Sequence, residues 1–119
     1  MLASPSAIPG TANIEFAVIP ARWSVAIDTF RSPPFHRNIA SEYVGLVSGT
    51  YLGKGEGFYP GCASLHNSFS GHGPDNEAFE RGIAADDSPQ YLPDTITIIF
   101  ETQLVIRPTR FALETEMLE

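Results

Sequence analysis

An imidazole and a carboxylate stand six positions apart in the segment PPFHRNIASEYVG, at His36 and Glu42. The run after Glu42 alternates in a way that predicts a strand with two largely apolar faces, which places Glu42 among buried side chains. A buried carboxylate is costly unless it is paired with a cation or bound to a metal. Glu42 is therefore expected to have a positively charged partner.

Two kinds of partner fit this carboxylate. One is a structural ion pair with Arg37 or Arg31, the nearest cations in the sequence. The other is a metal ion, because every histidine of the chain falls in or beside the turns that flank this strand and the next: His36, His66 and His72. Two imidazoles and one carboxylate on one side of an ion form the facial triad of non-haem Fe(II) oxygenases.

Length and charge limit the classes of function. The 119 residues suit one domain. A net charge of -7 without a basic cluster makes nucleic acid and anionic membrane poor partners. Cys62 is the only cysteine, which favours a reduced, intracellular protein. The first ten residues lack a signal peptide's basic and apolar regions, and no apolar run reaches the ~20 residues of a membrane span, so a cytoplasmic protein is expected.

The spacing of glycine and proline predicts the fold class. Ten Gly and ten Pro separate short segments rich in Val, Ile, Thr, Phe and Tyr, which is typical of a mainly β protein. Residues 1–12 are small and polar and are expected to be irregular. Residues 13–113 are expected to form the ordered domain, and residues 114–119 an acidic tail.

The first half of the chain predicts strands and one loop. Residues 13–26 are expected to form two short strands on either side of Pro20, and their continuous apolar run is typical of burial on both faces. Residues 41–52 form the next expected strand. The glycines of residues 53–61 predict a loop, and their spacing does not match a dinucleotide-binding fingerprint.

One short helix is expected, over residues 76–85, with Asp75 as its N-cap and acidic residues in its first turn. Its few apolar residues predict a superficial position. From Asp94 onward the sequence predicts two more strands, the second ended by Pro108. The residues after Leu113 are expected to be a helix stub or disordered.

The spacing H-x-N-x3-E-x6-G, which starts at His36 and ends at Gly49, resembles the first motif of the cupin superfamily. The segment PGCASLH loosely resembles the second motif. Asn38 stands where many cupins have a second histidine, so a third metal donor has to come from His66 or His72.

A narrower resemblance covers nearly all of residues 10–112. The segments IPARWSVA, DTFR, PPFHRN, GLVSGTY, EGFYPG, SLHN, HGPD and FET, in this order, are similar to the C-terminal catalytic part of the homogentisate 1,2-dioxygenase family. The resemblance implies a cupin-type jelly roll, present here as a partial barrel with one short helix. It also implies a reaction: with Fe(II) as cofactor, homogentisate and O2 become 4-maleylacetoacetate in tyrosine and phenylalanine catabolism. It further implies assembly as trimers that pair into hexamers.

The resemblance also assigns roles to residues. It implies that the iron ligands are His36, Glu42 and His72. It implies that the substrate pocket includes Tyr51 and His66, together with His72. Each histidine should donate its second ring N–H to an outer partner, and the candidates are a backbone carbonyl and the side chains of Asn38 and Asp75. Arg37 is expected in the same outer layer.

Several of these residues also have purely structural interpretations. Tyr51 belongs to a residue type that more often packs in a core or at its rim than contacts a substrate. Trp23 and Phe30 are expected to be packing residues. His66 and Asn67 are candidates for hydrogen bonds that stabilise a turn.

The resemblance implies that a large N-terminal β domain and a histidine that serves as acid-base group lie upstream of the matched segment in family members. No residue of this chain matches that histidine. Two functions of different class therefore stand: an Fe(II) dioxygenase, or a catalytic part of one, and a noncatalytic cupin remnant that binds a metal or a protein partner.

Overall fold

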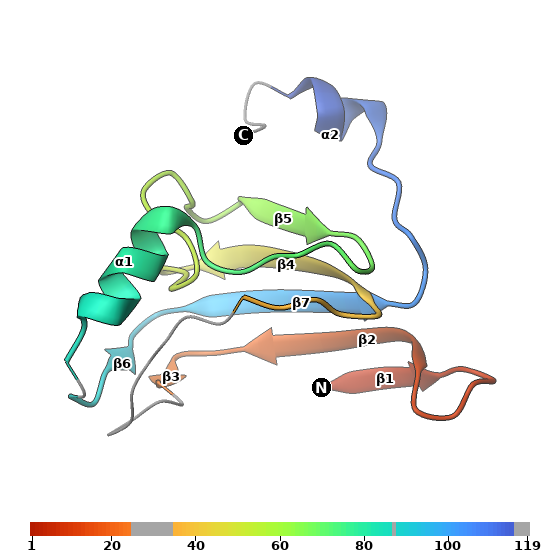
Figure 1. Cartoon of the computed structure of the whole chain (residues 1–119), viewed down its shortest axis with the longest axis horizontal. Coiled ribbons are helices and arrows are strands. Elements are labelled where there is room, and N and C mark those ends of the chain that lie inside the picture. Colours follow the sequence, from red (N-terminus) through yellow and green to blue (C-terminus); the bar gives the residue numbers. More distant parts are fainter. Residues whose placement is uncertain (25–34, 87, 116–119) are drawn as a thin grey trace.

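The computed structural model describes residues 1–24, 35–86 and 88–115 and is mainly β, as the sequence predicts (Figure 1). A five-stranded antiparallel sheet has the strand order β1-β2-β7-β4-β5, and β3 pairs with β6 in a small second sheet. The strands are β1 Leu2–Pro5, β2 Ala12–Ile19, β3 Arg22–Trp23, β4 Ser41–Ser48, β5 Ala63–His66, β6 Tyr91–Leu92 and β7 Ile96–Thr102. The helices are α1 Asn76–Ala84 and α2 Arg110–Glu114. No helix of these described residues is long and apolar enough to cross a membrane.

Strand β4 is the best buried element of the sheet. It is paired along both edges, with β7 on one side and β5 on the other. Val44 and Leu46 are each only 2% exposed, and Thr97 lies opposite Leu46 on β7 at 1%. Because alternate residues of a strand share a face, these side chains lie on the same face of β4 as Glu42.

A row of apolar side chains crosses all five strands of the main sheet. Paired positions place Leu2, Phe16, Phe100, Tyr43 and Leu65 side by side on one face. The rings of Phe16 and Phe100 have centroids 4.8 Å apart, and those of Tyr43 and Phe100 are 6.4 Å apart. This face, defined by these five residues, is called the apolar face below.

One position further along each strand, the opposite face carries a different row. The paired residues there are Ala3, Glu15, Glu101, Glu42 and His66. At these positions the register separates two chemistries: one row consists of apolar side chains, and the other contains three carboxylates that lead to an imidazole. The carboxylate row is defined as Glu15, Glu101 and Glu42.

The apolar face is largely uncovered among the described residues. Leu2 of β1 and Tyr43 of β4 are 73% and 37% exposed, and Ile14 and Val18, which flank Phe16 on the same side of β2, are 46% and 49% exposed. The two strands expected around Pro20 are confirmed as β2 and β3. The prediction that the first is buried on both faces is wrong, since no residue of β2 is buried. Its apolar residues alternate along the strand and lie on the exposed apolar face of the sheet.

The two ends of the chain also differ from the predictions. Residues 1–12 contain strand β1, which pairs with β2 at the edge of the sheet and ends at Pro5. After β7 the expected second strand is absent from the described residues 103–109. The side chain of Asn67 makes the hydrogen bonds that a neighbouring strand would otherwise make. Its amide accepts from Ile106 N at 2.9 Å and donates to Ile106 O at 3.2 Å. A short helix, α2, follows in place of a continued strand.

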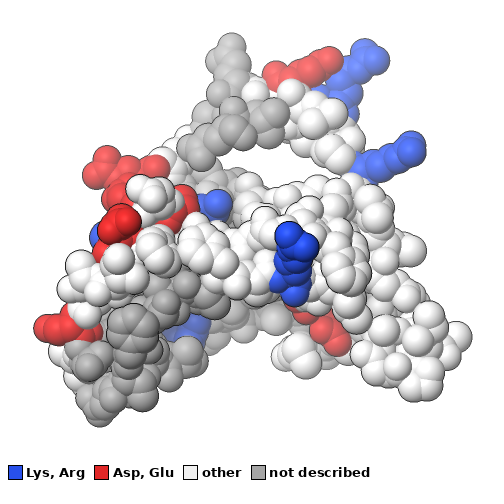
Figure 2. Space-filling model, in the orientation of Figure 1, with Lys and Arg blue, Asp and Glu red and all other residues white. Residues whose placement is uncertain are grey.

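Helix α1 begins where the sequence predicts. Asp75 caps it by accepting a hydrogen bond from Ala78 N at 2.8 Å, and Ala78 is its one buried residue. The same carboxylate accepts from Gly55 N, so it also ties the β4–β5 loop to the helix. The helix is therefore superficial, as expected, and acidic side chains gather over it (Figure 2).

Gly49 ends β4 in a conformation that favours glycine. Its φ is +73°, and an added Cβ would lie 2.7 Å from Asp94 O and 2.8 Å from Thr95 Cα. A hydrogen bond joins the two segments at this point, since Thr95 Oγ1 donates to Thr50 O at 3.0 Å. Gly49 thus lets the end of β4 approach the start of β7 before the chain continues to Tyr51.

Gly49→Ala is expected to lower the free energy of unfolding by about 2 kcal/mol or more, because it adds a backbone clash to the strain of a positive φ. Gly61→Ala is the matched control. Gly61 has φ +100° with open space around the missing Cβ, and its substitution should cost only about 1 kcal/mol. Urea unfolding measures both variants, and equal losses would contradict the close approach of β4 to β7.

Asp75→Ala is expected to destabilise the protein by about 1–2 kcal/mol, because α1 loses its cap and the loop loses its anchor. Hydrogen bonding, chiefly from Ala78 N, lowers the pKa of Asp75 from its ordinary value. The stabilisation is therefore present above the unfolded pKa of about 3.8 and is lost as the pH falls through the lower folded pKa. Unfolding of wild type, Asp75→Ala and Asp75→Asn between pH 3 and 7 tests this, since the asparagine retains a capping oxygen. A difference between wild type and alanine variant that persists unchanged below the folded pKa would contradict it.

Candidate metal centre

Two backbone hydrogen bonds bring the first and last candidate ligands together. His36 N donates to His72 O at 2.9 Å, and His72 N donates to His36 O at 3.0 Å. The segment before β4 is thereby joined to the segment before α1. Since the main chain makes these bonds, the placement of the two imidazoles does not depend on contacts of the imidazoles themselves.

Strand β4 supplies the carboxylate. Glu42 Oε1 lies 3.7 Å from His72 Nε2, and the Glu42 side chain is 16% exposed, close to the burial that the sequence predicts. One donor atom from each of His36, Glu42 and His72 lies within 4.8 Å of the other two. His36 is exposed and the other two are partly covered, so the cluster opens on the His36 side.

His72 has one satisfied and one unsatisfied ring nitrogen. Nδ1 lies 2.9 Å from Ser70 O, and a carbonyl oxygen can only accept, so the proton of the neutral ring is assigned to Nδ1. Nε2 is buried, has no hydrogen-bond partner among the described residues and faces Glu42. A lone pair directed at a carboxylate is stabilised by a cation between them, so the donor set fits a divalent metal ion.

The Ser70 carbonyl is also the outer partner that was expected for a ligating histidine. The two side-chain candidates make other contacts. Asn38 donates from Nδ2 to Glu101 Oε1 at 3.0 Å and accepts from Ala40 N at 3.2 Å. Asp75 caps α1, as described above. A backbone oxygen therefore fixes the tautomer of His72.

His66 lies beside the donor cluster rather than in it. Its ring stacks on that of His72, with centroids 4.4 Å apart and planes 8° from parallel. Burial, followed by the neighbouring His72, lowers the pKa of His66. His66 is consequently neutral at neutral pH and available to accept a proton.

Tyr51 reaches the same region from the segment that follows Gly49. Burial, followed by the negative charge of Glu42, raises the pKa of Tyr51. Its ring also packs against Phe58, with centroids 5.7 Å apart. The phenol thus combines the packing role suggested by its residue type with a protonated hydroxyl that can donate a hydrogen bond.

An ion pair of Glu42 with arginine is not seen among the described residues. The group within ion-pair distance of Glu42 there is the Nε2 atom of His72, at 3.7 Å, and Arg37 is exposed. Arg37 lines a groove of about 510 Å³ together with His36 and His72, at the open side of the cluster. Arg31, Phe30 and the prolines of the PPFHRN turn lie outside the described residues.

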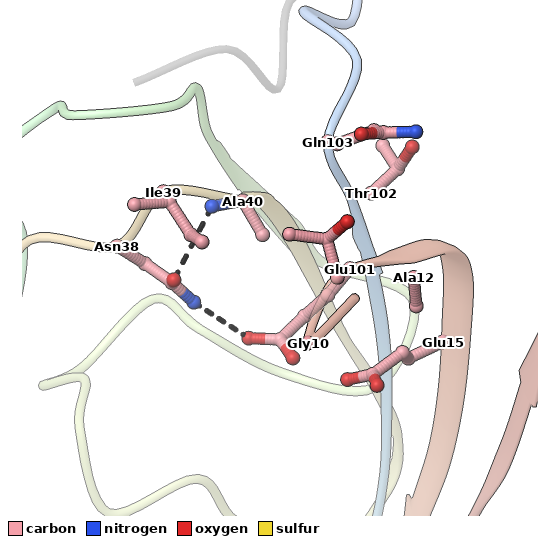
Figure 3. Close-up of a pocket in the computed structure, with 10 residues that line it drawn as sticks. Gly10, Ala12, Glu15, Asn38, Ile39, Ala40, Glu101, Thr102 and Gln103 are labelled. Carbon is pink, nitrogen blue, oxygen red and sulfur yellow. Dashed lines mark hydrogen bonds between the residues drawn. The ribbon is translucent and has the colours of Figure 1, made fainter. Parts of the chain in front are cut away.

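Glu101 is a further residue of this region that the sequence motifs do not indicate. It faces Glu42 across β4 and β7 and Glu15 across β2 and β7, and Asn38 reaches it over a cavity of about 150 Å³ (Figure 3). Burial, followed by Glu42 and Glu15, raises the pKa of Glu101. The alternation of ITIIFET was the available signal, since it places Glu101 on the face of Thr97 and Ile99.

Comparison with known families identifies the family of this chain. Residues 1–119, the whole chain, match the family described as homogentisate 1,2-dioxygenase C-terminal. That family is one of metal-dependent dioxygenases. The mainly β fold, the clustered donors His36, Glu42 and His72 and the family match together lead to one conclusion: this chain belongs to the homogentisate 1,2-dioxygenase C-terminal family.

Proposed function

We propose that this chain is the catalytic part of an Fe(II)-dependent dioxygenase that opens the ring of homogentisate with O2 and forms 4-maleylacetoacetate. The observation that carries the proposal is the buried, unpartnered Nε2 of His72, 3.7 Å from Glu42 Oε1 with His36 alongside. Family membership supports the reaction class.

The proposed ligands are His36, Glu42 and His72. Glu42 cancels one of the two positive charges of Fe(II), and neutral imidazoles leave the ion acidic enough to ionise a phenol. These three residues would hold the ion, and the exposed His36 side of the cluster would leave it accessible to substrate and oxygen. When bound, iron supplies the electron transfer between the aromatic ring and O2 that the side chains cannot supply.

Two neighbouring side chains have complementary roles in the proposal. His66, neutral because its pKa is lowered, accepts the proton released by a substrate phenol. Tyr51, protonated because its pKa is raised, donates a hydrogen bond to a substrate oxygen. Both atoms of O2 enter the product, so the side chains are required only to orient the substrate and to hold and return protons.

The apolar face favours a second candidate, a noncatalytic cupin that binds a metal or a protein partner. An uncharged row that includes Phe16, Phe100 and the 37%-exposed Tyr43 is the kind of surface that another protein covers. Assembly as paired trimers and a cytoplasmic location belong to the proposal as well. The two candidates agree on metal binding and differ on ring cleavage.

Removal of a ligand is expected to weaken Fe(II) binding by roughly 100-fold or more, since loss even of an outer partner typically costs 10–100-fold. Glu42→Gln and His72→Ala should both show the loss. His66→Ala, which removes the stacked imidazole but none of the three donors, is the matched control. Anaerobic competition with a chromophoric chelator measures the affinities. If His66→Ala lost iron while His72→Ala kept it, the third ligand would be His66.

Ring cleavage is tested by loading the full chain with Fe(II) without oxygen and then adding homogentisate and O2. The expected result is the ultraviolet absorbance of maleylacetoacetate, together with the consumption of one O2 per homogentisate. Glu42→Gln under the same conditions controls for free iron. A folded, iron-loaded sample that forms no product would favour the noncatalytic candidate.

A further inference from the structure

A series of hydrogen bonds joins the residues before β4 to the residues after β5. The two backbone bonds between His36 and His72 lie at its outer end. Further in, Phe69 N donates to Asn38 O at 2.9 Å. The inner end, next to the two strands, is made by side chains. The pairing of β4 with β5 is therefore continued beyond the strands, as far as the two histidines of the donor cluster.

The inner end is a hydrogen-bonded group of Ser41 and Asn67, called the serine–asparagine group below. Ser41 is 0% exposed, and its hydroxyl donates to Asn67 Oδ1 at 3.1 Å and accepts from Ser68 N at 3.1 Å. Ser41 directly precedes Glu42, and Asn67 directly follows the residue that is paired with Glu42, His66. The group therefore holds the ends of both strands next to this pair.

Asn67 also connects the group to the segment after β7, which leads to α2 (Figure 1). Its amide makes both hydrogen bonds with the backbone of Ile106. Among residues 103–110, all of which the structure describes, only Ile106 is not exposed. Asn67 Oδ1 thus accepts from Ile106 N and from Ser41 Oγ, while Nδ2 donates to Ile106 O. One amide joins three segments that lie far apart in the sequence.

Such a support matters for a metal centre. Metal affinity depends on how far the ligands are held in place beforehand, because the cost of ordering them is subtracted from the binding energy. Glu42 lies near the start of β4, and His36 and His72 lie outside the strands and helices. Without the serine–asparagine group, the ends of β4 and β5 beside these donors would be held by backbone pairing alone.

We propose that Asn67 is a positioning residue of the metal centre, and that through it metal binding and the order of residues 103–109 stabilise each other. The inference rests on the proposed function as far as metal binding by His36, Glu42 and His72 is concerned, and it does not depend on ring cleavage. Coupling between two sites is reciprocal. The factor by which loss of the Asn67 contacts weakens metal binding is therefore also the factor by which the metal stabilises those contacts.

The first measurement is the affinity of the full chain for Zn(II), a redox-inactive probe, by competition with a chromophoric chelator. Asn67→Ala and Ser41→Ala should each weaken binding by roughly 10-fold, the lower end of the loss for an outer partner of a metal ligand. The double variant should lose little more than the weaker-binding single variant, because both substitutions break the same hydrogen-bonded group.

Ser48→Ala is the matched control. It removes a serine hydroxyl at the other end of β4, where Ser48 Oγ donates to Asp94 O at 2.8 Å. Its effect on the affinity for Zn(II) should stay within about twofold, since it shares no partner with the serine–asparagine group. Combined with Asn67→Ala, it should add its own small effect and no coupling.

The second measurement uses the wild type, so it decides the question even if Asn67→Ala does not fold. Hydrogen exchange of the Ile106 amide, followed by NMR, should slow by roughly 10-fold when Zn(II) saturates the site. The Ala112 amide is the control, because it also donates to a side-chain oxygen, Thr109 Oγ1, at 3.2 Å. Its exchange should change by less than about twofold.

Wild-type affinity for Zn(II) in Asn67→Ala, or exchange at Ile106 that does not respond to the metal, would overturn the inference. His72→Ala separates this failure from a failure of the proposed function. If His72→Ala weakens binding while Asn67→Ala does not, the metal centre stands and the role of Asn67 is rejected. If His72→Ala and the wild type bind Zn(II) equally, the metal centre is wrong and the inference falls with it.

Discussion

The register of β4 between β7 and β5 is the constraint on which the candidate site depends. It places Glu42 opposite His66 on one side and opposite Glu101 on the other. A shift of β4 by one residue would put Tyr43 in the place of Glu42 and would turn Glu42 to the apolar face, away from Glu101 and His66. Gly49 protects this register at the end of the strand, because only glycine fits its close approach to Asp94 and Thr95.

The candidate site also depends on keeping its three donor side chains together, although their lone pairs and the charge of the carboxylate repel one another. The reciprocal backbone bonds of His36 and His72 meet it without using either imidazole. Glu101 adds to the repulsion, and the structure reduces it in two ways. Asn38 donates to Glu101, and the raised pKa of Glu101 means that this carboxylate loses its charge at a higher pH than an ordinary glutamate does.

Short sequence patterns predicted the elements whose formation depends mainly on residues close together in the chain. Alternation located the strand that holds Glu42, and Asp75 marked the start of α1. Strand β1 was overlooked because its small residues carry no periodic signal. The strand expected near Ile106 failed for a nonlocal reason, since the amide of Asn67 occupies the hydrogen-bonding groups that a neighbouring strand would use. The three proposed ligands do lie together, whereas the contact of Glu101 with the row required a cross-strand register that no local pattern gives.

The apolar face has a consequence for how copies of the chain behave toward one another. Their mutual repulsion comes from ionised carboxylates, and it vanishes as the pH approaches the isoelectric point near 4.8. The attraction between hydrocarbon faces such as that of Phe16, Tyr43 and Phe100 does not depend on protonation. Acidification therefore weakens the repulsion that keeps two sheets apart and leaves the attraction between their apolar faces unchanged, so association of copies through this face is favoured as the pH falls.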